Sequence, residues 1–211
     1  MPGYVRADVR REQLLAAARG VLVRDGLDRL TLRSVAAEAG VHLGTLQYVF
    51  RTRADLVAAL AERTLDLAGY GQFEIGPGGL RRELERLVEW IVVRFLADPA
   101  MLELLRHEYA VTVARVDPDA SIELPLRQRI APADYSVQMA EIGRRSDEAY
   151  QRSNEDLGRL WGMGLTGLLH EFLATRDMPR FRDDAALLVD AVVGLANRLP
   201  LALPRPGGLA S

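Results

Sequence analysis

Apolar side chains recur every three or four residues along most of this 211-residue chain, and this spacing is the strongest constraint on its fold. In a helix such residues share one face, whereas a half-buried strand needs apolar and polar residues to alternate. No segment of the sequence sustains that alternation. The pattern therefore predicts an all-α protein of about nine helices, the first over residues 9–25 and the last two over about 153–175 and 181–199.

The composition excludes several classes of protein. Hydrophobic residues make up 49% of the chain and charged residues 27%, the balance of a soluble globular protein. There is no cysteine, so disulfide bonds, thiolate zinc sites and cysteine nucleophiles are excluded. No apolar run is long enough for a signal peptide or a membrane span. We therefore expect a cytoplasmic protein without membrane contact.

The segment "GYGQFEIGPGG", residues 69–79, is a helix breaker because it is rich in glycine and contains a proline. It predicts a small helical domain over residues 1–72 and a larger one over 73–211. Up to residue 55, nine arginines stand against six acidic residues, a net charge of +3, which leaves −5 for the remainder. A mildly basic first domain permits DNA binding without requiring it.

Two short helices joined by a turn at Gly40 form the most informative part of the first domain. Thr31 is the predicted N-cap of the first short helix, and "VHLGTLQYVF", residues 41–50, forms the second. "TRAD", residues 52–55, is a predicted capping box that starts the next helix. From spacing alone, two interpretations stay open: a helix-turn-helix, or a three-helix unit whose polar face only meets water.

Within residues 41–50, helical spacing turns Leu46, Val49 and Phe50 inward. Gly44 and Tyr48 then lie on the opposite face. A glycine at such a position would let a nucleic-acid backbone approach the helix closely.

Residues 11–60, "REQLLAAARGVLVRDGLDRLTLRSVAAEAGVHLGTLQYVFRTRADLVAAL", resemble the DNA-binding domain of the TetR family of transcriptional regulators. The resemblance lies in the opening "REQLL", the "LTLRSVAAEAGV" helix and turn, the "GTLQYVF" recognition helix and the "RTRADL" helix start. The rest of the chain has the length and helix count of the family's ligand-binding body. The resemblance implies a dimer that binds double-stranded operator DNA.

The resemblance also implies roles for individual residues. Thr31 lies where family members contact the DNA backbone, and Arg33 lies where they contact a base edge. Gln47 can pair with adenine, and Tyr48 can reach a phosphate or a thymine methyl group. The complete set of implied DNA-contacting residues is Thr31, Arg33, His42, Leu43, Gly44, Thr45, Gln47, Tyr48 and Arg53.

The chain departs from the family pattern at four positions in residues 41–50. The family often has serine at position 42, lysine or arginine at 43, tyrosine at 47 and histidine at 49, where this chain has His42, Leu43, Gln47 and Val49. His42 is a poorer N-cap than serine, and Leu43 removes a phosphate contact. Arg53 keeps the charge of a lysine that binds phosphate in the family. The operator sequence is therefore beyond inference.

The predicted helix over 153–175 is apolar around most of its circumference, so it must be covered on two sides. Glycines at 158, 162, 164 and 167 would permit close helix approach. The resemblance implies that this helix and the last one pair with their twofold mates in a homodimer. The predicted interface residues are Trp161, Gly164, Leu165, Leu168, Leu188, Val192, Leu195 and Leu199.

Candidate residues for binding a small-molecule effector are Trp90, Arg94, Met101, His107, Tyr135, Met139 and Trp161. For Trp90, a cavity wall and a surface position are equally compatible with its place off the main apolar stripe. The three histidines are far apart in sequence, so we expect no metal site. No nucleophile, phosphate loop or paired-carboxylate pattern is present, so we expect neither catalysis nor a cofactor.

The sequence thus predicts a ligand-responsive transcriptional repressor, released from a near-palindromic operator by a small, largely hydrophobic molecule. Two alternatives stay open. The chain could be an all-helical module that only binds a small molecule, or an activator with the same architecture.

Overall fold

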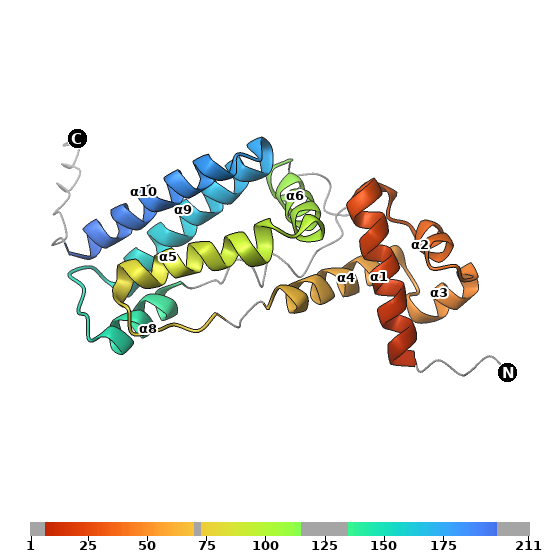
Figure 1. Ribbon diagram of the computed structural model, residues 1–211, viewed down its shortest axis with the longest axis horizontal. Coiled ribbons are helices and arrows are strands. Elements are labelled where there is room, and N and C mark those ends of the chain that lie inside the picture. The colour runs from red at the N-terminus through yellow and green to blue at the C-terminus, as the bar shows by residue number, and fades with distance from the viewer. Residues whose placement is uncertain (1–6, 70–72, 115–134, 198–211) are drawn as a thin grey trace, which may run out of the picture. The chain divides into compact units, whose positions relative to one another are not determined.

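The computed structural model describes residues 7–69, 73–114 and 135–197 (Figure 1). These residues form nine α-helices and no strand, so the all-α prediction is confirmed for the described part of the chain. The chain divides into two compact units, which we describe separately. Unit 1 contains residues 1–73 and 87–133, and unit 2 contains residues 74–86 and 134–211. The first break lies beside the predicted boundary at residue 72, and the second falls inside a helix, so the predicted two-domain split stays a prediction.

Unit 1 begins with four helices and a short 3₁₀ turn, coloured red to orange in Figure 1. They are α1 (Ala7–Asp25), η1 (Leu27–Arg29), α2 (Leu32–Glu38), α3 (Leu43–Val49) and α4 (Arg53–Ala68). α1 packs against α2 and α4, and α2 packs against α3. The core between them consists of fully buried apolar side chains, among them Leu14, Leu22, Val35, Leu46, Leu56 and Leu60.

Side-chain caps fix where α2 and α4 begin. The Thr52 hydroxyl accepts from the Asp55 N–H at 3.1 Å, and the Asp55 carboxylate accepts from the Thr52 N–H at 3.0 Å. This confirms the capping box predicted from "TRAD". Thr31 is the predicted N-cap of α2, and it forms a second capping box with Ser34, at 3.0 and 2.9 Å. Both caps satisfy N–H groups that would otherwise be unpaired, so they stabilise the N-termini of α2 and α4.

The apolar stripe that starts at Leu80 predicts a single helix ending near Asp98, but the structure interrupts it. α5 (Gly79–Ile91) is followed by a π-helical turn, η2 (Val92–Leu96), and then by α6 (Pro99–Ala114). The Ala97 N–H donates to the Val92 carbonyl at 3.0 Å, a five-residue step that inserts one extra residue into the turn. Val92, Phe95 and Leu96 are all buried within this turn.

Unit 2 consists mainly of α8 (Ser136–Ser146), α9 (Asn154–Thr175) and α10 (Met178–Ala196), with α9 packed against both of the others. α10 begins three residues before the predicted Phe181. The reason is an N-cap at Asp177, whose carboxylate accepts from the Arg180 N–H at 3.0 Å. The sequence also predicts a kink near Pro125 and Pro132 and a C-terminal tail over residues 203–211, and both lie outside the described residues.

Three of the four glycines in α9 are positions of close contact, as predicted. A Cβ on Gly158 would lie 2.5 Å from the backbone nitrogen of Ser136, and one on Gly162 would lie 2.9 Å from the Tyr135 ring. The place of a Gly164 side chain is taken by Leu188 of α10, whereas Gly167 has open space beside it. Among the described residues, no helix is both long and apolar enough to cross a membrane.

Candidate nucleic-acid interface

α3 is fixed to the rest of unit 1 by its inward side chains. Leu46 is fully buried and Phe50 is 1% exposed, while Val49 is half-buried, so the predicted inward face is confirmed. The guanidinium of Arg11 lies 4.7 Å from the centre of the Phe50 ring. Gly40 has a φ of 63°, a left-handed conformation that turns the chain between α2 and α3. Both ends of α3 are therefore held in place.

The opposite face of α3 is open to solvent. Gly44, Thr45, Gln47 and Tyr48 are all exposed, and Tyr48 is 90% exposed. A Cβ on Gly44 would meet no atom within 4 Å. His42, the N-cap of α3, makes no side-chain capping hydrogen bond, which agrees with its predicted weakness as a cap. Because tyrosine prefers to bury much of its ring, an almost fully exposed tyrosine is typical of a contact surface.

The charges around this face favour an anionic partner. α3 itself contains no acidic residue. Glu38 at the end of α2 is paired with Arg24 at 3.0 Å. Arg33 and Arg51 are exposed and make no hydrogen bond or ion pair within the described part of the chain. Exposed arginines without partners next to polar side chains can bind phosphates and base edges.

Arg53 has a different environment from the one the sequence suggested. Its Nε donates to the Leu30 carbonyl and its Nη2 to the Leu27 carbonyl, both at 2.7 Å. The guanidinium thus fastens the 3₁₀ turn η1 to the start of α4. Only its remaining N–H groups are available for a phosphate, and the phosphate contact stays a prediction.

α6 is attached directly to the helices that carry this interface. Arg19 of α1 forms two hydrogen bonds with the Asp98 carboxylate, at 2.8 and 3.1 Å. The same carboxylate accepts from the Ala100 N–H at 2.8 Å and so also caps α6. α6 contacts η1 as well. Burial lowers the pKa of His107 in α6, and its Nε2 atom is buried without a partner in the described structure.

The candidate effector-binding residues are divided between the two units. In unit 1, Trp90 is half-buried and lies between two phenylalanine rings, 6.0 Å from that of Phe73 and 5.2 Å from that of Phe95. Met101 is fully buried, and Arg94 is exposed. In unit 2, Met139 and Trp161 are fully buried and Tyr135 is half-buried. Their role in ligand binding stays a prediction.

The Trp161 indole nitrogen is buried without a hydrogen-bond partner in the described structure. No group of three or more potential metal-ligating side chains occurs among the described residues.

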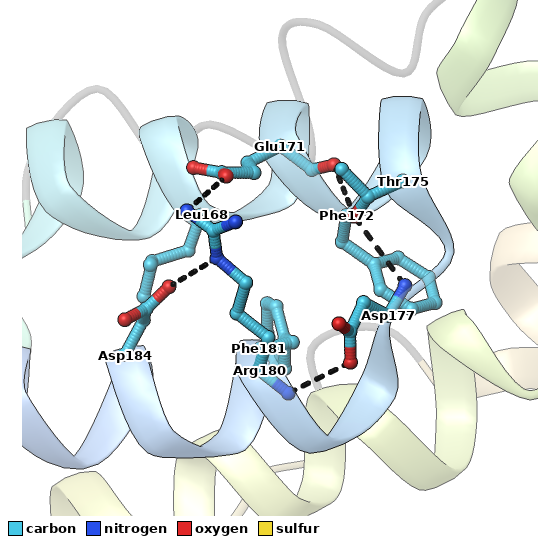
Figure 2. Close-up of a pocket in the computed structure, with 8 residues that line it drawn as sticks. All are labelled: Leu168, Glu171, Phe172, Thr175, Asp177, Arg180, Phe181 and Asp184. Atoms are coloured by element: carbon cyan, nitrogen blue, oxygen red, sulfur yellow. Dashed lines mark hydrogen bonds and ion pairs between the residues drawn. The ribbon is translucent and has the colours of Figure 1, made fainter.

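A small hollow lies where α9 turns into α10. Figure 2 shows Arg180 reaching between Glu171 and Asp184, at 2.7 and 3.5 Å. Below it the rings of Phe172 and Phe181 meet edge to face, with centroids 5.6 Å apart. The hollow has a volume of about 10 Å³, room for one water molecule. It therefore belongs to the packing of the α9–α10 pair and is too small for an effector.

Part of the predicted dimer interface is buried within a single chain. Trp161, Leu165 and Val192 are at most 3% exposed, so little of their surface is open to a partner subunit, and the interface itself stays a prediction. They form the contact of α9 with its own neighbours, and Gly164 is covered by Leu188. Leu168, Leu188 and Leu195 are half-buried, and Leu199 lies outside the described residues.

Other residues of α9 and α10 are exposed. Met163 on α9 is 63% exposed and Leu187 on α10 is 65% exposed, and Thr166, Gly167 and Ala191 are exposed as well. We call these five exposed residues the outer face. The sequence contained this signal only in part, because a helix that is apolar all round does not reveal which side its own chain covers.

Known proteins are similar to this chain in sequence, both in the helix-turn-helix region and over a longer part of the chain. Residues 14–60 match the family described as bacterial regulatory proteins, tetR family. The DNA-binding transcriptional repressor TetR of Mycobacteroides abscessus is 28% identical over 141 residues, which are 66% of this chain and 69% of that protein.

Solved structures share the fold. That of a transcriptional regulator from Rhodococcus sp. Rha1 has a TM-score of 0.67 at 18% identity and covers 90% of this chain and 99% of its own. The multidrug binding protein EbrR, in complex with imidazole, has a TM-score of 0.57 at 23% identity, covering 91% of this chain and 97% of that one.

The fold and the exposed recognition helix define a helix-turn-helix transcriptional regulator. Residues 14–60 match the DNA-binding region of the TetR family, and the fold is shared with solved transcriptional regulators. Members of this family are DNA-binding transcription factors and not enzymes, in agreement with the sequence analysis.

Proposed function

We propose that this chain is a ligand-responsive repressor that binds a near-palindromic operator as a homodimer in the cytoplasm. The observation that supports it best is the face of α3, where Tyr48 is 90% exposed while Leu46 and Phe50 hold the helix in place. Arg33, at the start of α2, is exposed and has no partner in the described structure. In a dimer, two such helices would read half-sites one turn of DNA apart.

The contact between α6 and α1 supports the proposal that the protein responds to a ligand. Arg19 and Asp98 join α1 to the start of α6, so a shift of α6 would be transmitted to α1. A small molecule releases DNA only if it binds the non-binding conformation more tightly than the binding one. The effector itself is proposed to be largely hydrophobic, and the seven candidate residues remain its proposed contacts.

A gel shift on the DNA upstream of the chain's own gene tests the DNA-binding proposal. The Tyr48→Ala, Arg33→Ala double variant is expected to bind at least about tenfold more weakly, since one specific base contact contributes about 1–3 kcal/mol. Arg82→Ala is the matched control, because it removes an exposed arginine from α5 in unit 2. The unmodified protein should also bind less tightly as salt concentration rises.

Two results of this gel shift would count against the proposal. One is the absence of any shift at low salt. The other is a shift that the double variant produces as strongly as the control does, because the face of α3 would then not be in contact with DNA. In either case a helical module that only binds small molecules would be the better description.

Gly44→Ala should separate stability from DNA binding. A Cβ there meets no atom within 4 Å, so the folded state should gain about 0.5–1 kcal/mol from the better helix propensity of alanine. DNA affinity should nevertheless fall, because the added methyl group would stand where a phosphate backbone approaches α3. Thermal unfolding and the gel shift measure the two effects.

Gly20→Ala is the matched control for this variant. It adds a methyl group to α1, at an ordinary contact distance of 3.6 Å from Glu38. It should therefore change stability without changing DNA affinity. Equal DNA affinity of the Gly44→Ala and Gly20→Ala variants would mean that DNA does not approach Gly44.

A further inference from the structure

A second and larger hollow lies in unit 2, between the end of α8 and the start of α9. Its volume is about 250 Å³, which is enough for a small metabolite. The lining residues are mostly polar or charged: Ala140, Gly143, Arg144, Glu148, Ala149, Tyr150, Arg152, Ser153 and Asn154. None of the sequence predictions pointed to this place.

Arg152 is the unusual member of this lining. Its side chain is half-buried, and its Nε atom is fully buried without a hydrogen-bond partner. No hydrogen bond or ion pair joins Arg152 to any other residue in the described ranges. A buried guanidinium nitrogen without a partner costs free energy that a suitable ligand would recover. The Nε–H group of Arg152 is therefore a donor in the wall of the hollow for which the described structure supplies no acceptor.

The other charged side chains of the lining already have hydrogen-bond or ion-pair partners. Arg144 is paired with Glu141 through Nε and Nη2, at 2.7 and 2.6 Å. These contacts, with those from Arg145, lower the pKa of Glu141 to about 2, so this carboxylate stays ionised. Glu148 accepts from the Leu80 N–H at 2.9 Å and is thereby held at the start of α5. The carboxylate of the lining is thus not positioned to neutralise Arg152.

Neutral donors complete the lining. Burial, followed by the nearby Glu148, raises the pKa of Tyr150 above its ordinary value, so its hydroxyl group stays protonated. Ser153 is the N-cap of α9 and Asn154 is its first residue, so the positive end of a 22-residue helix borders the hollow. Of the charged residues in the lining, Arg152 is the one without a partner in the described structure. A negatively charged ligand therefore fits the hollow and a cation does not.

The loop that forms the hollow is held in place from two sides. The Glu148 N–H donates to the Gly143 carbonyl at 3.0 Å, and the Gln151 N–H donates to the Ala196 carbonyl of α10 at 2.8 Å. A Cβ on Gly143 would lie 2.9 Å from the Glu148 carbonyl oxygen, so glycine is required for the loop to lie against α8. The hollow is therefore preformed, which reduces the cost of binding.

We propose that this hollow binds a small molecule through a phosphate or carboxylate group that accepts hydrogen bonds from Arg152. The planar guanidinium can bind either oxyanion with two parallel hydrogen bonds. The site is distinct from the DNA-binding face in unit 1, and the proposal does not depend on DNA binding.

Thermal unfolding of the full chain in rising concentrations of potassium phosphate tests the proposal, with ionic strength held constant by potassium chloride. A second series uses potassium acetate. The unmodified protein should show a saturable rise in unfolding temperature in at least one series, and the anion that saturates at the lower concentration identifies the preferred group. Phosphate also stabilises proteins in general, but that effect does not saturate and is common to all variants.

Arg152→Met is the decisive variant, and Arg159→Met is its matched control. Arg159 lies on α9, which begins just after Arg152, and unlike Arg152 it is exposed and paired with Glu155 at 2.8 Å. We expect Arg152→Met to weaken the saturable response at least about tenfold, the usual effect of losing a charge-assisted hydrogen bond, and Arg159→Met to retain it. Without anion, Arg152→Met should unfold at the same or a higher temperature than the unmodified protein, because it loses no partner.

Three outcomes would overturn the proposal. They are a response without saturation in both series, a saturable response that Arg152→Met retains, and an anion-free unfolding temperature lowered more by Arg152→Met than by Arg159→Met. The last outcome would assign Arg152 a structural role. A gel shift with the same two variants reports on DNA binding separately, so failure of one proposal is distinguishable from failure of the other.

Discussion

Gly158→Ala is expected to lower the unfolding temperature by roughly 5–10 °C, one of the largest effects of a single methyl group in this chain. The added Cβ would lie 2.5 Å from the Ser136 backbone nitrogen and 2.7 Å from the Tyr135 carbonyl carbon. These are backbone atoms, which cannot rotate away as a side chain can, so the start of α8 would have to move off α9. Overpacking of this kind costs about 1–3 kcal/mol and occasionally more.

Gly167→Ala is the control for this prediction. It makes the same substitution on the same helix, but its Cβ would meet no atom within 4 Å. Alanine favours the helix over glycine, so this variant should unfold at the same or a higher temperature. Circular dichroism at the helical band measures both variants. Equal unfolding temperatures would mean that α8 does not lie against α9 at Gly158.

The sequence predicted well where local chemistry determines the structure. The capping box at Thr52 and Asp55, the turn at Gly40 and the inward Leu46 all depend on residues within a few positions of one another. Such signals are encoded in residue type and spacing. For the same reason the exposed face of α3 could be identified before the structure was known.

The sequence failed where distant contacts decide. The apolar stripe between Leu80 and Phe95 is continuous, so it gave no sign of the π turn at Val92–Leu96. The sequence also gave no sign that Arg53 donates to the carbonyls of Leu27 and Leu30, while its phosphate contact stays a prediction. Each of these partners lies more than 20 residues away in sequence, beyond the reach of periodicity.

The same reason limits what the sequence can predict about a dimer interface, which stays a prediction. In α9, apolar residues cover nearly the whole circumference, so their periodicity does not distinguish the side facing α8 and α10 from the side facing outward. The structure shows Trp161 buried within the chain and Met163 exposed, two positions further along the helix. We therefore expect a homodimer to form through Met163 and not through Trp161.

Leu187→Glu is expected to dissociate the proposed homodimer. Leu187 is 65% exposed on α10, and with Met163 on α9 it is one of the two large apolar side chains of the outer face. In a symmetric dimer each substitution occurs twice, so two carboxylates would lose hydration without gaining partners. We expect the dimer dissociation constant to rise at least about 100-fold, since an unpaired buried charge costs several kcal/mol. Sedimentation equilibrium measures this change directly.

Val137→Glu is the matched control, because Val137 is 66% exposed on α8, outside the outer face. It should leave the dimer intact, and circular dichroism should show both variants folded. Because an operator with two half-sites is bound tightly only by two joined recognition helices, Leu187→Glu should also weaken the gel shift far more than Val137→Glu does. If Leu187→Glu sediments as the unmodified protein does, the dimer does not form through the outer face. If it becomes monomeric but keeps full operator affinity, DNA recognition does not require the dimer, because α3 and its flanking arginines remain unchanged in each monomer.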